Sequence, residues 1–209
     1  MIDNIKLISQ SSIRIDNNGI IIYFDPFKID NDSFDADYIF ITHSHYDHFS
    51  KEDILKIKKD STKIVVTNDL YDEVLKMGFS DILVVEPNND YSIDNISFKT
   101  VPAYNIKKDF HKKEYNWVGY IININNKILY IAGDTDNIPE IRNIKCDIAF
   151  VPVGGTYTMD YKEASELIDE MKPKLAVPIH YKTVVGSVED AYNFKKELEG
   201  KVEVTILMK

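Results

Sequence analysis

The pattern of hydrophobic and polar positions predicts the same order of elements in both halves of the chain. In the first half, two apolar strands flank the turn DNNG and form a predicted hairpin that ends at Asp25. In the second half, residues 117–124 and 127–134 repeat this pattern around the turn Asn125–Asn126 and end at Asp134. The offset of about 110 residues indicates an internal repeat.

The elements after each hairpin follow the same order. An apolar strand introduced by an aspartate comes next, at residues 37–42 and 147–152. A helix is then predicted by a capping residue with an acid three positions later, from Ser50 to Asp53 and from Asp160 to Glu163. The remaining predicted elements are strands at 63–67, 81–85, 174–180 and 202–207, and helices at 69–77 and 188–198.

Two units of mixed strands, each covered by helices, bury their apolar surface best as two sheets packed face to face with the helices outside. The expected fold class is therefore α/β (α+β), as a four-layer αβ/βα sandwich. We expect a single domain over residues 1–209, built from two half-repeats.

Composition narrows the class of protein. With 44% hydrophobic and 28% charged residues, the 209-residue chain is typical of a globular domain. Its net charge of −9 disfavours nucleic-acid binding, which needs a basic surface. No signal peptide and no membrane-spanning apolar run is recognisable, so we expect a cytoplasmic protein without a membrane partner. The single cysteine, Cys146, is expected to be a small core residue and not a nucleophile.

The strongest chemical signal is HSHYDH at residues 43–48, directly after a predicted strand. His43 and His45 leave the strand end on the same side and can therefore reach one metal ion. Asp47 and His48 lie one turn onward and point at a neighbouring position. Imidazole and carboxylate ligands without a thiolate fit zinc, with manganese and iron as alternatives.

Two further candidate ligands end buried strands of the second half. Asp134 lies in AGDTD, and His180 lies in VPIHY. Because strand ends meet along one edge of a sheet, these two residues are expected to converge on the loop at 43–48.

HSHYDH, AGDTD and VPIHY, in this order and spacing, resemble the metallo-β-lactamase-fold hydrolase superfamily over nearly the whole chain. The similarity is greatest to the short branch that includes ascorbate-6-phosphate lactonase-like proteins. The resemblance implies that His43 and His45 bind a first metal, that Asp47, His48 and His180 bind a second, and that Asp134 bridges them. It also implies that Asp25 orients a ligand histidine.

The chain departs from the family at one position. The superfamily usually supplies a third histidine to the first metal, where this chain has Tyr104 and Asn105. Asn105, water or His111 is the candidate replacement, and His111 is alternatively a proton donor or a substrate contact. We therefore expect one or two ions per chain, with the first held more loosely.

The expected activity is hydrolysis of an ester, lactone or phosphoester of a small anionic substrate by a metal-bound hydroxide, with Asp47 and His111 as catalytic residues. A basic rim is expected from Lys107, Lys108, Lys112 and Lys113, and a substrate-facing turn from Tyr157 and Met159. The alternatives are a nucleic-acid phosphodiesterase and a non-enzymatic metal-binding module. Relatives in this branch often assemble, so a homo-oligomer is compatible with the resemblance.

Overall fold

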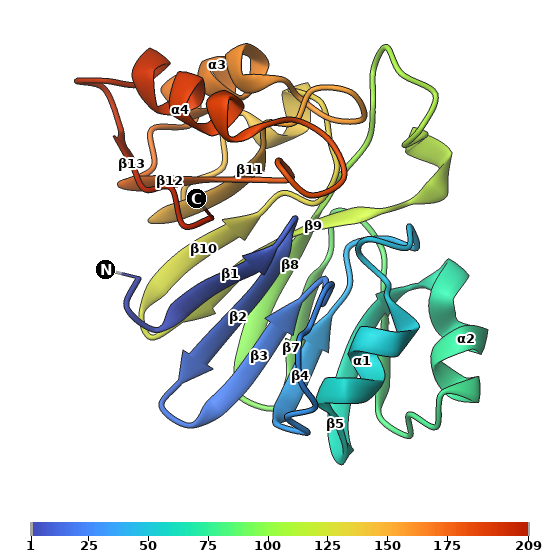
Figure 1. The fold of residues 1–209 in the computed structure, drawn as a ribbon. Coiled ribbons are helices and arrows are strands. Elements are labelled where there is room, and N and C mark those ends of the chain that lie inside the picture. Colours follow the sequence, from blue (N-terminus) through green and yellow to red (C-terminus); the bar gives the residue numbers. More distant parts are fainter. Residues whose placement is uncertain (1, 209) are drawn as a thin grey trace. The chain divides into compact units, whose positions relative to one another are not determined.

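The computed structural model describes residues 2–208, and the chain divides into two compact units, Met1–Glu86 and Pro87–Lys209. Each unit contains one mixed β-sheet (Figure 1). We call them the first unit and the second unit.

The first unit is a six-stranded sheet in the order β1-β2-β3-β4-β5-β6. Strands β1 to β3 pair antiparallel, and β3 to β6 pair parallel. Helix α1 connects β4 to β5, and helix α2 connects β5 to β6. The elements are β1 (Ile5–Ser9), β2 (Ser12–Asn17), β3 (Ile20–Phe24), β4 (Ala36–Phe40), α1 (Lys51–Ile57), β5 (Lys58–Thr67), η1 (Asn68–Leu70), α2 (Tyr71–Lys76) and β6 (Ile82–Val85).

The second unit is a seven-stranded sheet in the order β13-β12-β11-β10-β9-β8-β7. Strands β7 to β10 pair antiparallel, and β10 to β13 pair parallel. The elements are β7 (Asp90–Ile93), β8 (Ile96–Pro102), η2 (Lys113–Tyr115), β9 (Val118–Ile124), β10 (Lys127–Ile131), η3 (Pro139–Ile141), β11 (Ile148–Pro152), α3 (Tyr161–Met171), β12 (Leu175–Ile179), α4 (Val188–Glu197) and β13 (Glu203–Val204).

The two sheets share one pattern of pairing. The series β1–β6 and the series β8–β13 each consist of two antiparallel steps followed by three parallel steps. The strand β7 is the additional one, and it forms a hairpin with β8. Sequence patterns did not predict β1, β7 or β8. The two sheets therefore correspond in one further pair of strands, β1 and β8, beyond the elements on which the predicted repeat was based.

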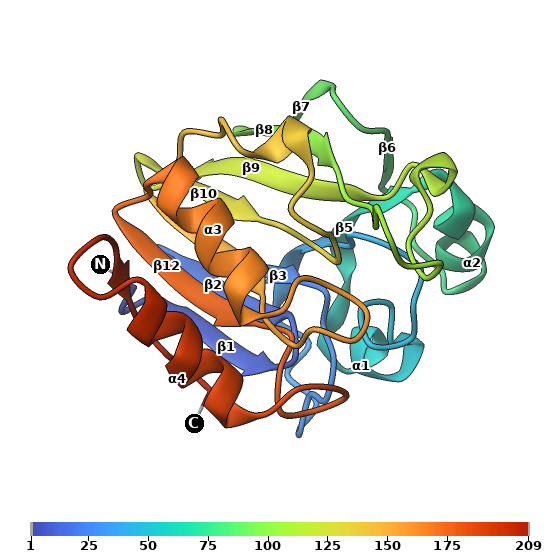
Figure 2. The ribbon, with the colours of Figure 1, turned by 90° about the horizontal axis from the view of Figure 1, so that it is seen from above.

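The helices cover one face of each sheet. In the second unit, α3 and α4 lie side by side against β11 and β12 (Figure 2). Helix α3 begins with the predicted capping box, in which Asp160 and Glu163 each accept from the other's backbone N–H. In the first unit, Ile54 and Ile57 of α1 and Val74 of α2 are buried in a cluster with inward residues of the strands. The predicted fold class, two mixed β-sheets with helices, is confirmed.

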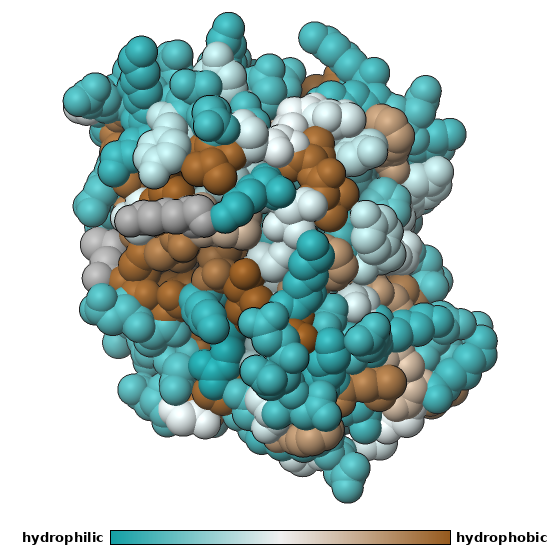
Figure 3. Space-filling model, viewed as in Figure 1, coloured by the Kyte–Doolittle hydropathy of each residue, from teal (hydrophilic) through white to brown (hydrophobic). Residues whose placement is uncertain are grey.

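Hydrophilic side chains cover much of the face shown in Figure 3, interrupted by hydrophobic patches. No helix among residues 2–208 is long and apolar enough to cross a membrane. Cys146 lies with its sulfur 3.7 Å from that of Met171, and burial raises the pKa of its thiol to about 12. A thiol that stays protonated at neutral pH is a poor nucleophile.

We expect the packing of α3 to carry much of the stability of the second unit. Leu167 is fully buried there, so Leu167→Ala should lower the free energy of unfolding by about 2–5 kcal/mol. Leu75→Ala on α2 is the matched control, because this leucine is 52% exposed. Urea unfolding followed by circular dichroism measures both variants, and equal midpoints for the two would contradict this account of the core.

Candidate metal centre

The Asp25 carboxylate is the anchor of the candidate ligands in the first unit. It follows β3 in a left-handed backbone conformation (φ 44°) and is fully buried. Its Oδ1 accepts from the Thr42 backbone N–H at 2.8 Å, and its Oδ2 accepts from the Thr42 hydroxyl at 2.7 Å. A non-glycine residue with positive φ is uncommon and is held only when its surroundings fix it.

This anchor determines which ring nitrogen of two histidines carries the proton. The Nδ1 of His48 lies 2.8 Å from Asp25 Oδ2, which can only accept, so Nδ1 carries the proton. The Nδ1 of His43 lies 3.0 Å from the Thr42 hydroxyl, whose own proton is donated to Asp25. His43 is therefore also protonated at Nδ1. In both neutral rings the lone pair is at Nε2, as required for metal binding through that atom.

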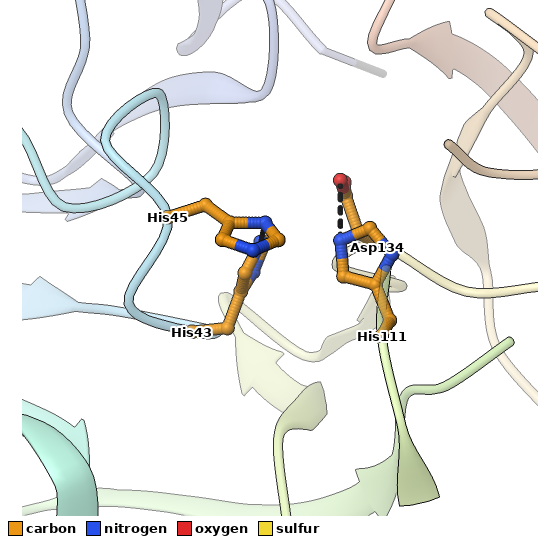
Figure 4. A group of neighbouring side chains, drawn as sticks. All are labelled: His43, His45, His111 and Asp134. Atoms are coloured by element: carbon orange, nitrogen blue, oxygen red, sulfur yellow. Dashed lines mark hydrogen bonds and ion pairs between the residues drawn. The ribbon is translucent and has the colours of Figure 1, made fainter. Parts of the chain in front are cut away.

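The rest of HSHYDH folds into a turn that is closed by bonds from the backbone N–H groups of His48 and Phe49 to the His45 carbonyl. His43 Nε2 and His45 Nδ1 lie 3.2 Å apart, and Figure 4 shows both rings extending from this loop. The Asp47 carboxylate is buried and accepts from the side-chain amide of Gln10 at 3.2 Å. Gln10 lies in the turn between β1 and β2, and no sequence pattern pointed to it.

In the second unit, two buried histidines converge on one carboxylate oxygen. Asp134 follows β10, and its Oδ2 lies 3.0 Å from His180 Nε2 and 3.2 Å from His111 Nε2. Figure 4 shows the contact with His111. His180 follows β12 with φ 57°, and a Cβ atom on Gly154 would lie only 2.2 Å from the His180 carbonyl oxygen. Glycine at 154 therefore permits the backbone position of His180.

His111 comes from the loop between β8 and β9 and is fixed by Asn105. The backbone N–H of Asn105 donates to the His111 carbonyl at 2.7 Å, and the His111 backbone N–H donates to Asn105 Oδ1 at 3.1 Å. His111 Nδ1 lies 2.9 Å from the same Oδ1. Because this amide oxygen can only accept, it favours the tautomer with the proton at Nδ1 and the lone pair at Nε2.

The donor atoms of each unit fit a divalent cation. Two ligands about 2.0–2.1 Å from one tetrahedral zinc ion lie about 3.3 Å from each other. The three short separations given above, 3.2, 3.0 and 3.2 Å, are close to that value. Nitrogen lone pairs facing each other or a carboxylate at this distance are stable only with a cation or a proton between them. The candidate ligands, taken unit by unit, are His43, His45, Asp47 and His48, and then His111, Asp134 and His180.

Two of the four lysines in the basic segment at 107–113 already form ion pairs with carboxylates of the protein. Lys108 Nζ lies 2.8 Å from Asp136 Oδ1, and Lys113 Nζ lies 2.8 Å from Glu140 Oε1. The hydrogen bond between Lys113 and Glu140 lowers the pKa of Glu140 and raises that of Lys113. Within residues 2–208, Lys107 and Lys112 are exposed and make no ion pair. The predicted rim of four lysines is therefore reduced to these two.

The turn after β11 differs from the prediction at one position. Met159 is fully buried in the hydrophobic core of the second unit, so the expectation that it faces a substrate is wrong. The Tyr157 ring instead packs edge-on against the 47% exposed Phe110, with ring centroids 4.7 Å apart. Phe110 immediately precedes His111, so this aromatic pair lies beside a candidate ligand.

Known proteins are similar to this chain in sequence and in fold. Residues 4–180 match the family model of the beta-lactamase superfamily domain. The chain belongs to this superfamily. It is 31% identical to a UPF0173 metal-dependent hydrolase of Thermococcus onnurineus, covering 89% of this chain and 88% of the relative. It is 34% identical to another from Nanoarchaeum equitans, covering 84% of each.

A crystal structure assigned as a metal-dependent hydrolase from Parabacteroides distasonis is similar to this chain with a TM-score of 0.83. The identity is 27%, over 98% of this chain and 93% of the other. The superfamily inferred from HSHYDH, AGDTD and VPIHY is thereby confirmed, and the protein is a metal-dependent hydrolase. The similarity to ascorbate-6-phosphate lactonase-like proteins stays a prediction.

We expect loss of the Asp25 carboxylate to weaken metal binding without removing any proposed ligand. In Asp25→Asn, an amide nitrogen at the position of Oδ2 cannot accept from the Thr42 hydroxyl or from His48 Nδ1, so both hydrogen bonds are lost. Zinc affinity should therefore fall about 10–100-fold. Competition with a chromophoric chelator measures this affinity, and Asp32→Asn, at an exposed position, is the control. Unchanged zinc affinity in Asp25→Asn would show that the anchor does not orient the ligands.

Proposed function

We propose that the candidate ligands of the two units act together as one binuclear centre for zinc, with manganese or iron as alternatives. In this proposal His43, His45 and His111 serve the first ion, Asp47, His48 and His180 serve the second, and Asp134 bridges them. The centre hydrolyses an ester, lactone or phosphoester of a small anionic substrate.

The observation that carries the proposal is the oxygen beside Nδ1 of three histidines. In His43, His48 and His111 the Nδ1 atom lies 3.0, 2.8 and 2.9 Å from an oxygen of the protein, an arrangement that favours Nε2 as the ligand atom. Orientation of ligand histidines by protein oxygens is typical of metal centres. Membership of a superfamily of metal-dependent hydrolases supports the same function.

Bound divalent ions lower the pKa of a coordinated water and stabilise the charge that develops on an acyl or phosphoryl oxygen. The protein chain places the side chains that surround these ions. Asp47, held by Gln10, is positioned to carry a proton between the attacking water and the leaving group. Lys107 and Lys112 are the cations proposed to attract the anionic part of the substrate.

The two ions should differ in affinity. His48 is backed directly by the Asp25 carboxylate, whereas His111 is backed by the neutral amide of Asn105. A carboxylate partner increases the basicity of a ligand imidazole more than an amide does. We therefore keep the prediction that the first ion is held more loosely, and titration of metal-free protein that showed two equally tight ions would contradict it.

Hydrolysis should depend on the bound metal. Chelation should abolish turnover of a panel of aryl esters, lactones and phosphoesters, and zinc or manganese should restore it. His43→Ala should lower kcat/KM by at least about 10²-fold, as expected for a lost ligand. His45→Ala and a metal count by elemental analysis accompany it. No turnover of any compound by protein shown to hold two ions would refute the proposed activity, and turnover of RNA alone would favour the phosphodiesterase.

The two unpaired lysines should affect substrate binding and not chemistry. Lys107→Ala combined with Lys112→Ala should raise KM for an anionic substrate several-fold, with a weaker effect at high salt. Lys195→Ala, an exposed lysine on α4, is the control. If KM for anionic and neutral substrates changed equally, these lysines would not select for charge.

A further inference from the structure

The amide of Asn105 is fully engaged within the second unit. Its oxygen accepts from the backbone N–H and the Nδ1–H of His111, at 3.1 and 2.9 Å. Its nitrogen donates to Asp136 Oδ1 and to the Tyr157 carbonyl, both at 3.0 Å. Both donors and the oxygen are thus used, and the residue is buried. An amide oxygen that already accepts two hydrogen bonds is a poor metal ligand.

The carboxylate behind this amide is itself firmly held. Asp136 is 5% exposed, and its Oδ2 accepts from the Ile106 backbone N–H at 2.8 Å. Its Oδ1 also accepts from Lys108, whose ammonium donates further to the Thr158 carbonyl at 2.7 Å. The ion pair with Lys108 offsets the cost of burying the carboxylate.

We propose that Asp136 and Asn105 form a relay that positions His111, so that the histidine at 111 replaces the one the family resemblance places near 105. Asn105 is then a positioning residue, and His111 is the ligand of the first ion. This inference rests on the proposed metal centre and specifies how one of its ligands is held.

The relay selects one of two competing tautomers. His111 has an acceptor on each side of its ring, Asn105 Oδ1 at Nδ1 and Asp134 Oδ2 at Nε2. Protonation at Nε2 would block the lone pair needed for metal. A carboxylate is the stronger acceptor of the two, so the ring needs a firmly oriented amide to keep its proton at Nδ1. Asp136 provides that orientation because it accepts only from the nitrogen end of the amide.

The first test separates the ligand from the positioning residue by metal titration. Asn105→Leu keeps the size of the side chain and removes its polar atoms, and the looser ion should then bind about 10–100-fold more weakly. The tighter ion, assigned to Asp47, His48 and His180, should keep its affinity, which shows that the variant is folded. His111→Ala should remove the looser ion. Asn123→Asp, on the exposed side of β9, is the control.

A reciprocal exchange is the second test. Asn105→Asp together with Asp136→Asn keeps one carboxylate and one amide in the relay but places the carboxylate directly on His111. A carboxylate-backed histidine is a stronger ligand, but the new carboxylate also faces the Tyr157 carbonyl, so the double variant should bind the looser ion more tightly than Asn105→Leu does. An affinity as low as that of Asn105→Leu would overturn the relay.

The histidine tautomer gives a readout that does not depend on activity. In zinc-loaded protein labelled with ¹⁵N-histidine, the His111 ring should show a proton on Nδ1 and a metal-shifted Nε2. A His111 ring that carries its proton on Nε2 in the zinc-loaded protein, or normal binding of both ions by Asn105→Leu, would refute the inference. If both ions bind as expected but no substrate is hydrolysed, the relay stands and the proposed activity fails.

Discussion

The burial of the Asp25 carboxylate is the constraint on which the first unit's chemistry depends. A charged carboxylate without solvent needs several donors, and Asp25 has three of them, the Thr42 N–H, the Thr42 hydroxyl and His48 Nδ1. Satisfying that charge fixes the backbone after β4 and the rings of both His43 and His48 at once. The orientation of His43 and His48 is therefore a consequence of the hydrogen bonds that the buried Asp25 carboxylate requires.

The second unit also contains a buried carboxylate that needs hydrogen-bond donors, and different groups supply them. The buried Asp136 carboxylate is compensated by Lys108 and by N–H donors of Ile106 and Asn105. Through Asn105 it reaches His111, as Asp25 reaches His48 directly. Both units thus use a carboxylate outside the proposed ligand set to orient a histidine inside it, and they differ in whether an amide lies between the two. That difference is the physical basis for expecting unequal affinities.

Sequence patterns predicted those parts of the protein in which local signals agree. Strand periodicity placed Asp25, Asp134 and His180 at strand ends, and the spacing in HSHYDH predicted the candidate metal-binding loop. The internal repeat gave no signal for the hairpin β7–β8, because β7 has no counterpart in the first unit. The hydrogen bonds between Asn105 and His111 depend on how the loop at 105–111 closes, and the contact of Gln10 with Asp47 joins residues far apart in sequence. Neither leaves a periodic signal.

In the loop from Asn105 to His111, some side chains point inward and hold His111, whereas others are exposed on the surface. Hydrogen bonds hold the side chains of Asn105, Lys108 and His111 inward, whereas the side chains of Ile106, Lys107, Asp109 and Phe110 are exposed. Exchanges at these four exposed positions leave the inward hydrogen bonds intact. Side chains at these positions can therefore change without disturbing how His111 is held, and they form a compact set for directed evolution.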